Sequence, residues 1–348
     1  MDTSSFARAA VSRRSLLRGA AAGAGLFAAH ASSLAAVGAQ RAAPSAASPG
    51  AQAAGPQYSL WFLEYANAPE FPVSGMLYGA HNRGTMRVPF GYTVIKGEGA
   101  VAVFDVGFSM AKAGGEKLAN TFGVHDWESP EVVLGKIGLS PADITHAFIG
   151  HAHFDHMGNI SGFPNAGVYV QEREITEWMN ALNFPAELSW VTGAVDPQDV
   201  MDATQAAVQQ RLVLVPGEMR DVLPGVHLFP AWDTHTFGTQ YATVTTGSGD
   251  DARTFVCAGD AIYWYANVEG APQWGIPEGT YTPLGYGQGN QVTQLQKMLE
   301  MVQQAGGSPA QIIPGHDPTV FERFPSKKVG PNSVAEIHLA PGEPSRVA

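Results

Sequence analysis

The chain of 348 residues is poor in cysteine, in charge and in long apolar runs. Its one cysteine, Cys257, excludes an intramolecular disulfide framework. Charged residues make up only 15%, and 31 acidic side chains outnumber 20 basic ones, which gives a formal net charge of −11. Because this balance repels a phosphate backbone and no basic stripe is present, nucleic-acid binding is not expected. The hydrophobic share of 45% still suffices for a large globular core.

The first 39 residues resemble an export signal rather than a part of the fold. The run S-R-R-S-L-L-R at positions 12–18 is a twin-arginine pattern, and a mildly apolar stretch at 19–39 follows it. Gly23, Gly25 and His30 interrupt that stretch too often for a good membrane helix, so stable membrane insertion is not expected. The resemblance to bacterial Tat signals implies contact with the Tat machinery, folding before export, and a periplasmic or secreted product. The alternative is a disordered alanine-rich tail.

The remaining chain divides into a flexible linker at 40–57, rich in Ala, Pro, Ser and Gly, and one domain at 58–348. Strands are predicted at 58–65, 92–96, 100–107, 144–150, 167–171, 211–215, 226–232, 241–246, 254–258 and 311–314. Helices are predicted at 130–137, 173–182, 197–210 and 291–304. Segment 66–89 is expected to be a long loop with Phe71, Met76, Leu77 and Tyr78 as pocket candidates. Strands interleaved with helices indicate an α/β protein.

Four potential metal ligands lie within six residues, at the point where the strand predicted at 144–150 ends. They are His151, His153, Asp155 and His156. Imidazole and carboxylate groups together suit a borderline divalent cation such as zinc. The ends of strands in α/β proteins are also where binding sites tend to lie. The alternative is a histidine-rich surface loop.

Three other predicted strands are followed by a side chain of the same kind, with glycine close by. His235 follows the strand at 226–232, Asp260 follows the strand at 254–258, and His316 follows the strand at 311–314. Glycine lets the backbone turn and approach a site closely. Three such coincidences after the six-residue motif predict that these segments converge on one metal site.

This ordered set resembles the H-x-H-x-D-H motif, later His, Asp and final His of the metallo-β-lactamase superfamily, over roughly residues 58–320. The resemblance implies a four-layer αββα sandwich and two divalent metal ions. It assigns His151, His153 and His235 to one ion, Asp155, His156 and His316 to the other, and Asp260 to a bridge between them. Zinc is expected, although the same ligands accept manganese, cobalt or iron. Two such ions lower the pKa of a shared water from about 15.7 towards 7, which supplies a nucleophile at neutral pH.

Three blocks are similar to the N-acyl-homoserine lactonase branch of this superfamily. They are H-A-H-F-D-H-M-G-N at 151–159, H-T-F-G-T-Q at 235–240, where positions 237 and 239 depart from the pattern, and D-A-I-Y at 260–263. The resemblance assigns the Tyr263 hydroxyl to the lactone carbonyl, where it stabilises the oxyanion or orients the substrate. The alternative for Tyr263 is aromatic packing. A β-lactamase activity is disfavoured, because antibiotic-degrading relatives lack the bridging aspartate and Cys257 is interpreted as a buried apolar residue.

The resulting hypothesis is a dinuclear metal-dependent hydrolase that opens the ring of an N-acyl-homoserine lactone or a related lactone. Asp155 or Asp260 would shuttle the proton to the leaving alkoxide. The alternatives are an exported organophosphate or aryl-ester hydrolase on the same scaffold, and a non-haem iron oxidoreductase. The aromatic segment 263–286 is expected to form a lid over the substrate or a homodimer surface. Asp105 is expected to support the ligands from behind, and His81 is a candidate for reaching the pocket.

Overall fold

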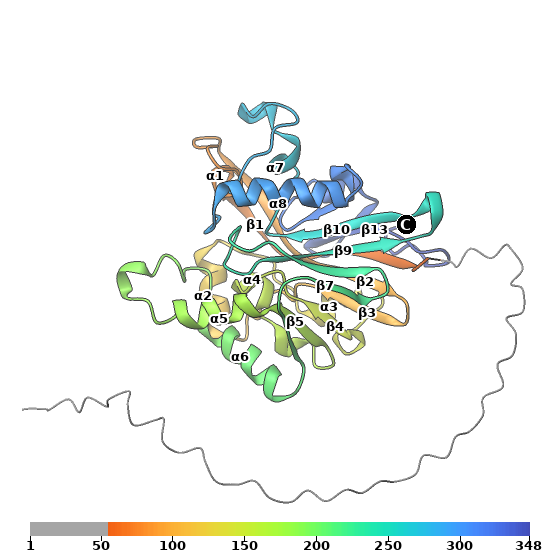
Figure 1. The fold of residues 1–348 in the computed structure, drawn as a ribbon, viewed down its shortest axis with the longest axis horizontal. Coiled ribbons are helices and arrows are strands. Elements are labelled where there is room, and N and C mark those ends of the chain that lie inside the picture. Colours follow the sequence, from red (N-terminus) through yellow and green to blue (C-terminus); the bar gives the residue numbers. More distant parts are fainter. Residues whose placement is uncertain (1–54) are drawn as a thin grey trace, which may run out of the picture. The chain divides into compact units, whose positions relative to one another are not determined.

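The computed structural model describes residues 55–348, which contain two sheets with helices on their outer faces (Figure 1). The larger sheet has the strand order β12-β13-β1-β2-β3-β4-β5-β6, and the smaller sheet has the order β11-β10-β9-β8-β7. The strands of the larger sheet are β1 (Tyr58–Pro72), β2 (Thr85–Gly97), β3 (Ala100–Phe104), β4 (His146–Phe148), β5 (Gly167–Gln171), β6 (Leu212–Val215), β12 (Ser326–Val329) and β13 (Asn332–His338). Those of the smaller sheet are β7 (Met219–Leu223), β8 (Val226–Pro230), β9 (Gln240–Thr246), β10 (Arg253–Gly259) and β11 (Ile312–Pro314).

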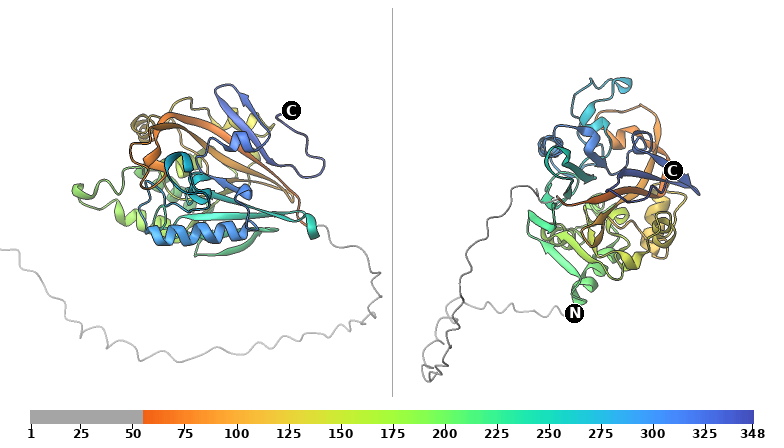
Figure 2. Two further views of the ribbon diagram at one scale, coloured as in Figure 1. Left: turned by 90° about the horizontal axis from the view of Figure 1, so that it is seen from above. Right: turned by 90° about the vertical axis from the view of Figure 1, so that its right-hand side faces the viewer.

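The helices cover the outer face of each sheet, as the views in Figure 2 show. They are α1 (Val73–Met76), α2 (Ala113–Thr121), α3 (Pro130–Gly135), α4 (Phe154–Met157), α5 (Glu172–Ala181), α6 (Pro197–Val208), α7 (Ala266–Glu269), α8 (Gln291–Gln304) and α9 (Val320–Arg323). Helices α3, α5 and α6 contact β1, β5 and β6 of the larger sheet, whereas α8 contacts β10 of the smaller sheet. The layer order is helix, sheet, sheet, helix, which confirms the predicted αββα sandwich.

The side chains of β1 alternate between two apolar cores. Leu60 and Phe62 lie in the core between the sheets, together with Leu228 of the smaller sheet. Trp61 and Leu63 point to the other side, into the core beneath the helices. This period of two is the pattern of a strand that is covered on both faces.

Parallel pairing brings the ends of several strands to one edge of the sandwich. Strands β3 to β6 run parallel to one another in the larger sheet, and β10 runs parallel to β11 in the smaller sheet. The carboxyl ends of parallel strands meet at the same edge of a sheet. A hydrogen bond of 2.8 Å from Gln240 N to Gly150 O then joins the start of β9 to the loop after β4. The loops that carry the predicted ligands are therefore brought together by the topology.

The expectation of a long loop at 66–89 is wrong. Strand β1 continues to Pro72 and β2 begins at Thr85, so that only α1 and a turn separate the two strands. They pair over nearly their whole length, with irregularities after Glu64 and Ala68 that absorb extra residues as β-bulges do. Cross-strand pairing thus overrides the low strand propensity of the Pro, Gly and Asn residues in this segment.

Other elements were also absent from the sequence-based prediction. Strands β7, β12 and β13 and helix α2 were not expected, and the strand expected at 144–150 shortens to β4. Strand β12 is polar and mostly exposed, and it forms the edge of the larger sheet, where the sequence shows no apolar alternation. Residues 1–54, with the predicted export signal and most of the linker, lie outside the described residues. Between residues 55 and 348, no helix combines the length and hydropathy needed to cross a membrane.

Cys257 lies in β10 inside the core between the two sheets, with 1% of its surface exposed. Burial raises the pKa of its thiol well above the ordinary value. We therefore expect no reaction between the native protein and a thiol-directed disulfide reagent at pH 8, and one reactive thiol per chain after denaturation. Spectrophotometric titration measures both states. Stoichiometric reaction of the native protein within minutes would show that the inter-sheet core does not exclude the reagent.

Candidate metal centre

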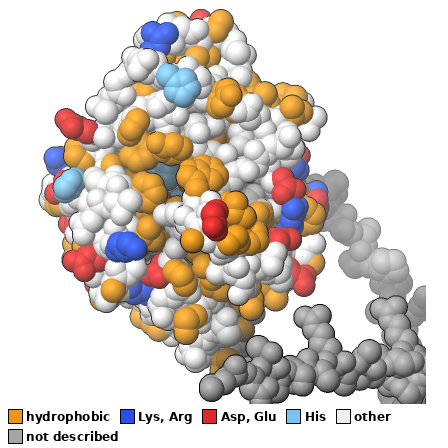
Figure 3. Space-filling model, turned by 90° about the vertical axis from the view of Figure 1, so that its left-hand side faces the viewer, with side chains coloured by type: hydrophobic (Ala, Val, Ile, Leu, Met, Phe, Trp, Pro, Cys, Tyr) orange, Lys and Arg blue, Asp and Glu red, His pale blue; other side chains and the backbone are white. Residues whose placement is uncertain are grey.

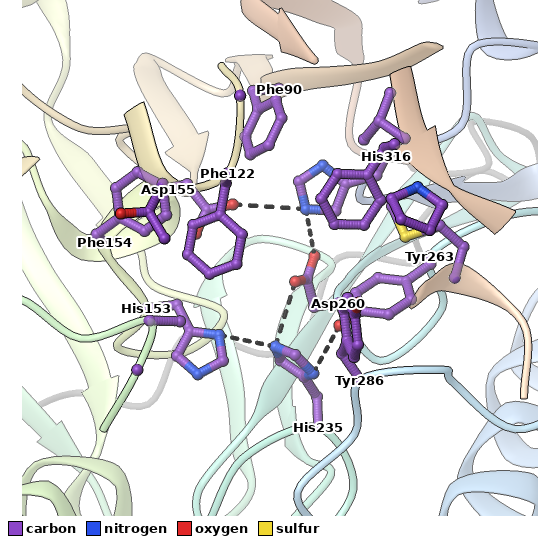
Figure 4. A pocket seen from close by; sticks show the side chains of 18 of the residues that line it. Phe90, Phe122, His153, Phe154, Asp155, His235, Asp260, Tyr263, Tyr286 and His316 are labelled. Atoms are coloured by element: carbon purple, nitrogen blue, oxygen red, sulfur yellow. Dashed lines mark hydrogen bonds and ion pairs between the residues drawn. The ribbon is translucent and has the colours of Figure 1, made fainter. Parts of the chain in front are cut away.

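Seven imidazole and carboxylate side chains meet where the loops after four strands converge, and Figure 4 shows five of them. The loop after β4 carries His151 and leads to His153, which is followed at once by α4 with Asp155 and His156. His235 lies between β8 and β9, Asp260 directly follows β10, and His316 lies beyond β11. All seven are buried. The structure thus brings together every residue that the sequence singled out as a metal ligand.

Asp260 stands between two groups of ligand atoms. Its Oδ2 atom lies 3.7 Å from His151 Nε2 and 3.3 Å from His235 Nε2, which is itself 2.9 Å from His153 Nδ1. Its Oδ1 atom lies 3.2 Å from His156 Nε2 and 3.1 Å from His316 Nε2. The two carboxylate oxygens therefore face different sets of imidazoles, which is the geometry of a bridging ligand.

The approach of the β11 loop to Asp260 depends on Gly315. A Cβ atom at this position would lie 2.4 Å from Asp260 Oδ1 and 3.0 Å from the backbone of Gly259. Only glycine allows the chain to pass this close, and His316 follows directly.

The second group of ligand atoms is completed by Asp155, whose Oδ2 atom lies 3.3 Å from His156 Nε2 and 3.6 Å from His316 Nε2.

The protonation states of the first group favour a cation. Burial, with the neighbouring His235 imidazole, lowers the pKa of His153 to about 3, and burial lowers the pKa of His235 to about 4 although Asp260 opposes it. Their imidazoles are therefore neutral at pH 7. His151 Nε2, His156 Nε2 and Asp260 Oδ1 are buried without a hydrogen-bond partner. In the second group burial is outweighed by the nearby carboxylates, chiefly Asp260, which raise the pKa of His156 and of His316, so a metal ion bound there would displace protons. The neutral imidazoles of the first group and the unpaired atoms of both groups fit a dinuclear site for divalent metal ions.

Two groups behind the ligands fix the orientation of the second set of imidazoles. Asp105 Oδ2 lies 2.8 Å from His156 Nδ1, and Asp105 Oδ1 accepts a hydrogen bond of 2.6 Å from Gly150 N. His316 Nδ1 lies 2.9 Å from the carbonyl oxygen of Pro89 in β2. A proton on each Nδ1 leaves Nε2 free to bind a metal. Asp105 therefore lies where it was expected, behind the ligands.

Glu174 in α5 is a structural support that the sequence interpretation missed. Its carboxylate is fully buried and accepts hydrogen bonds from Ala152 N at 2.7 Å, Gly238 N at 2.6 Å, Trp178 Nε1 at 2.8 Å and Thr236 Oγ1 at 2.9 Å. Ala152 lies between two ligands of the β4 loop, and Thr236 and Gly238 follow His235 in the loop after β8. One carboxylate thus holds two ligand loops together. The available signal was an acidic residue on the apolar face of a predicted helix, beside Ile175 and four residues before Trp178.

A cavity of about 670 Å³ opens over the ligand cluster, and Asp155, Asp260, Tyr263 and His316 are among the residues that line it. Its walls are largely aromatic: Phe90, Phe122, Phe154 and Tyr286 are seen in Figure 4, and Phe71 and Trp190 also contribute. Among the described residues, no lysine or arginine lines the cavity, and Glu70 is the one charged residue of the lining outside the ligand set. The cavity therefore suits a ligand whose non-reacting part is uncharged and apolar.

The structure shows which of the pocket residues predicted from the sequence line the cavity. Phe71 and Met76 line the cavity, whereas Leu77 is buried in the core, and Tyr78 and the exposed His81 lie outside the lining. Within segment 263–286 only the end residues Tyr263 and Tyr286 line the cavity. In its middle, the rings of Trp264 and Trp274 lie 5.5 Å apart, and Trp274, Ile276 and Tyr281 pack against the core. The segment as a whole therefore does not cover the cavity.

Replacing Glu174 by glutamine should loosen both ligand loops. The amide offers one acceptor oxygen where the carboxylate offers two, and its NH₂ group would face donors that it cannot satisfy. We expect the free energy of unfolding to fall by roughly 1–3 kcal/mol and the metal content of the purified protein to fall with it. Denaturant titration and elemental analysis measure these quantities. Glu172→Gln, at an exposed position of the same helix, is the matched control. Equal stability and metal content in the two variants would remove the assigned role.

Comparison with known structures shows which proteins share this fold. A probable metal-dependent hydrolase from Staphylococcus aureus matches with a TM-score of 0.55 and 20% identity, over 75% of this chain and 90% of that one. A quorum-quenching N-acyl homoserine lactone lactonase matches with a TM-score of 0.53 and 18% identity, over 80% and 98% of the two chains. The hydrolase AbOPH gives 0.55 and 17%, over 83% and 99%. At these identities the likeness establishes the fold alone.

Sequence comparison gives a curated relative and a family. The transcription termination factor FttA of Cenarchaeum symbiosum (strain A) is 28% identical over 145 residues, which are 40% of this chain but only 22% of that protein. The chain therefore spans about a fifth of the length of this relative. Residues 92–316 match the model of the metallo-beta-lactamase superfamily, a range that includes all seven side chains of the cluster. Because this match covers more than half of the chain, the protein belongs to the metallo-β-lactamase superfamily.

Proposed function

We propose that the protein is a dinuclear metal-dependent hydrolase that opens lactone rings, those of N-acyl homoserine lactones or of related lactones. The observation that carries the proposal is the position of Tyr263, whose hydroxyl lies beside the ligand His235 at the base of an apolar cavity. The structural likeness to an N-acyl homoserine lactone lactonase supports the same reading.

The ligand set is proposed to hold two divalent metal ions, for which we expect zinc. When bound, the two ions supply Lewis acidity and lower the pKa of a water molecule, so that a nucleophile exists at neutral pH. His151, His153 and His235 would hold one ion, and Asp155, His156 and His316 would hold the other. Asp260, whose two oxygens face both sets of imidazoles, would contribute to each. The protein's contribution is to hold these seven groups in place before the substrate arrives.

Tyr263 is proposed to donate a hydrogen bond to the carbonyl oxygen of the substrate. Its hydroxyl lies 3.1 Å from His235 Nδ1. When Nε2 of His235 serves as a ligand, the proton of the ring is on Nδ1, so His235 donates to the oxygen of Tyr263. The hydroxyl proton of Tyr263 then remains available to the cavity. Burial, reinforced by Asp260, raises the pKa of Tyr263 well above 10.0, so the group stays a donor at neutral pH.

Ring opening requires that a proton reach the leaving alkoxide, and two carboxylates of the cavity can carry it. Asp155 and Asp260 both line the cavity. Burial alone would raise the pKa of each carboxyl group. The neighbouring imidazoles, chiefly that of His156, outweigh burial and hold both pKa values below the usual value. Both groups are therefore ionised at neutral pH and can accept a proton before releasing it to the alkoxide oxygen.

The second candidate is an organophosphate or aryl-ester hydrolase. The aromatic cavity walls favour it. It places a neutral aryl ester over the same ligands, so the cavity lining does not distinguish it from a lactonase. A non-haem iron oxidoreductase requires the same donor set with redox-active iron. Substrate tests and metal analysis separate these three functions.

A panel of neutral esters in weakly buffered solution with a pH indicator tests the proposal. The panel contains N-acyl homoserine lactones, simple γ- and δ-lactones, aryl esters and phosphotriesters. We expect the lactones to give the highest kcat/KM, close to two metal ions per chain by elemental analysis, and loss of turnover after chelation. Absence of proton release with every lactone would refute the proposal. Faster turnover of aryl esters or phosphotriesters would assign the second candidate, and one redox-active iron per chain would assign the oxidoreductase.

Replacing Tyr263 by phenylalanine removes the proposed donor and leaves the ring in place. We expect kcat for lactones to fall about 10²- to 10³-fold, as for the loss of an oxyanion donor, with little change in KM or in metal content. Steady-state kinetics with elemental analysis measure this. Tyr281→Phe removes a hydroxyl that does not line the cavity and is the control. A kcat equal to that of the control would leave Tyr263 with a packing role only.

A further inference from the structure

One wall of the cavity comes from segment 183–195, which connects α5 to α6. It carries three large apolar side chains at the surface: Phe184 is 39% exposed, Leu188 45% and Trp190 69%. Of these, Trp190 lines the cavity. Figure 3 shows apolar side chains gathered around a hollow on this face of the molecule. A contiguous apolar surface around a pocket mouth marks a binding surface more often than chance exposure does.

Segment 183–195 is built almost entirely from local turns. Its backbone hydrogen bonds join residues three positions apart, such as Val191 N to Leu188 O at 3.0 Å and Gly193 N to Trp190 O at 3.2 Å. Two bonds tie it to other residues of the cavity wall, Phe154 and Gln288. Phe154 N donates to Ala194 O at 2.9 Å, and the side chain of Gln288 donates through Nε2 to Val191 O at 2.6 Å. The segment is thus fastened on each side of the cavity, directly beside Trp190.

Gln288 links this segment to a ligand loop. Its backbone N donates to the carbonyl oxygen of His235 at 2.9 Å, while its side chain holds Val191. The backbone beside Trp190 is therefore joined through Gln288 to the loop that carries His235.

The facing walls consist of aromatic rings that contact one another. The rings of Phe71 and Tyr286 meet edge to face at 6.1 Å, and those of Phe122 and Phe154 stack at 5.8 Å. A Cβ atom at Gly75 would lie 2.6 Å from the ring of Tyr286 and 2.8 Å from that of Phe71, so this pair is fitted closely against α1. Tyr286 is 47% exposed, and Trp190, at 69%, is the most exposed large apolar side chain of the cavity lining.

We propose that Trp190 binds the distal apolar part of the substrate, an acyl chain or an aryl group that extends from the reacting ester towards solvent. This inference rests on the proposed ester hydrolysis and names the residue that determines which substrate tails are preferred. Contact with the indole removes apolar surface of both partners from water. Since no basic side chain of the described residues lines the cavity, an anionic tail finds no partner there. The enzyme then selects long or bulky apolar tails over short ones.

A homologous series of N-acyl homoserine lactones, with acyl chains from four to twelve carbons, tests the inference. For the wild-type enzyme we expect kcat/KM to rise two- to fourfold with each added methylene until the wall is covered, because full removal of a methylene from water corresponds to about fourfold. Trp190→Ala should flatten this slope through KM and cost about tenfold at the long end. It should leave the shortest substrate, and kcat, nearly unchanged.

Two further variants separate specificity from general damage. Met201→Ala removes a 62% exposed apolar side chain of α6 that does not line the cavity, and it should keep the wild-type slope. Gln288→Ala removes the bond to Val191 and should flatten the slope less than Trp190→Ala does. A Trp190→Ala slope equal to that of the wild type would overturn the proposal. An equal loss at every chain length would also overturn it, because that result indicates damage to the reacting centre.

A binding experiment keeps the inference distinct from the proposed function. Calorimetric titration with N-butylacetamide and N-decylacetamide, which carry a tail but no ester, measures the tail contribution without turnover. The decyl compound should bind at least tenfold more tightly to the wild type than to Trp190→Ala, whereas the butyl compound should not distinguish them. Failure of all ester hydrolysis with this difference intact would refute the lactonase proposal alone. Equal decyl binding, or a change from dimer to monomer in sedimentation without a change in slope, would assign the patch to other contacts and overturn the inference.

Discussion

The centre depends on the contacts of one carboxylate, that of Asp260, whose two oxygens lie 3.1 to 3.7 Å from two different sets of imidazoles. Each buried polar atom left unpaired costs about 1–3 kcal/mol, so positive charge beside these oxygens stabilises the cluster. Divalent ions on both sides of Asp260 would supply that charge. The surrounding protein then has one task, which is to hold the other six side chains, from three further loops, in fixed positions around that carboxylate.

Two buried carboxylates perform this task without any lysine or arginine partner. Asp105 receives Gly150 N and orients His156, while Glu174 receives backbone and side-chain donors from the loops that carry His151, His153 and His235. Irregular loops bury N–H groups that no strand satisfies, and these carboxylates satisfy them at the positions next to the ligands. Asp105 and Glu174 thus satisfy buried backbone N–H groups and at the same time fix the positions of the metal-binding side chains.

The sequence sufficed to single out the seven candidate ligands because they follow apolar strands, whose ends the topology brings together. The alternation of helix and strand periodicities predicted an α/β protein, whereas the four layers were implied by the resemblance to the metallo-β-lactamase superfamily. What the sequence did not predict depends on partners distant in sequence: the extended pairing of β1 with β2, the exposed edge strand β12, and the burial of Glu174. Trp190 lies in a segment of local turns, whose position over the cavity follows from Gln288, almost a hundred residues later. The export signal at 1–39 remains a prediction.

The origin of the cavity walls has a consequence for how this protein can change. The candidate metal ligands lie at the ends of core strands, whereas Tyr286 and Trp190 come from connecting segments and Phe71 from the last residues of β1. Among the aromatic wall residues, Phe154 is the one that lies between candidate ligands in the sequence. Mutations in the connecting segments can therefore reshape the cavity wall while the ligand cluster stays intact. The shape of the cavity and the composition of the metal centre can change independently of each other.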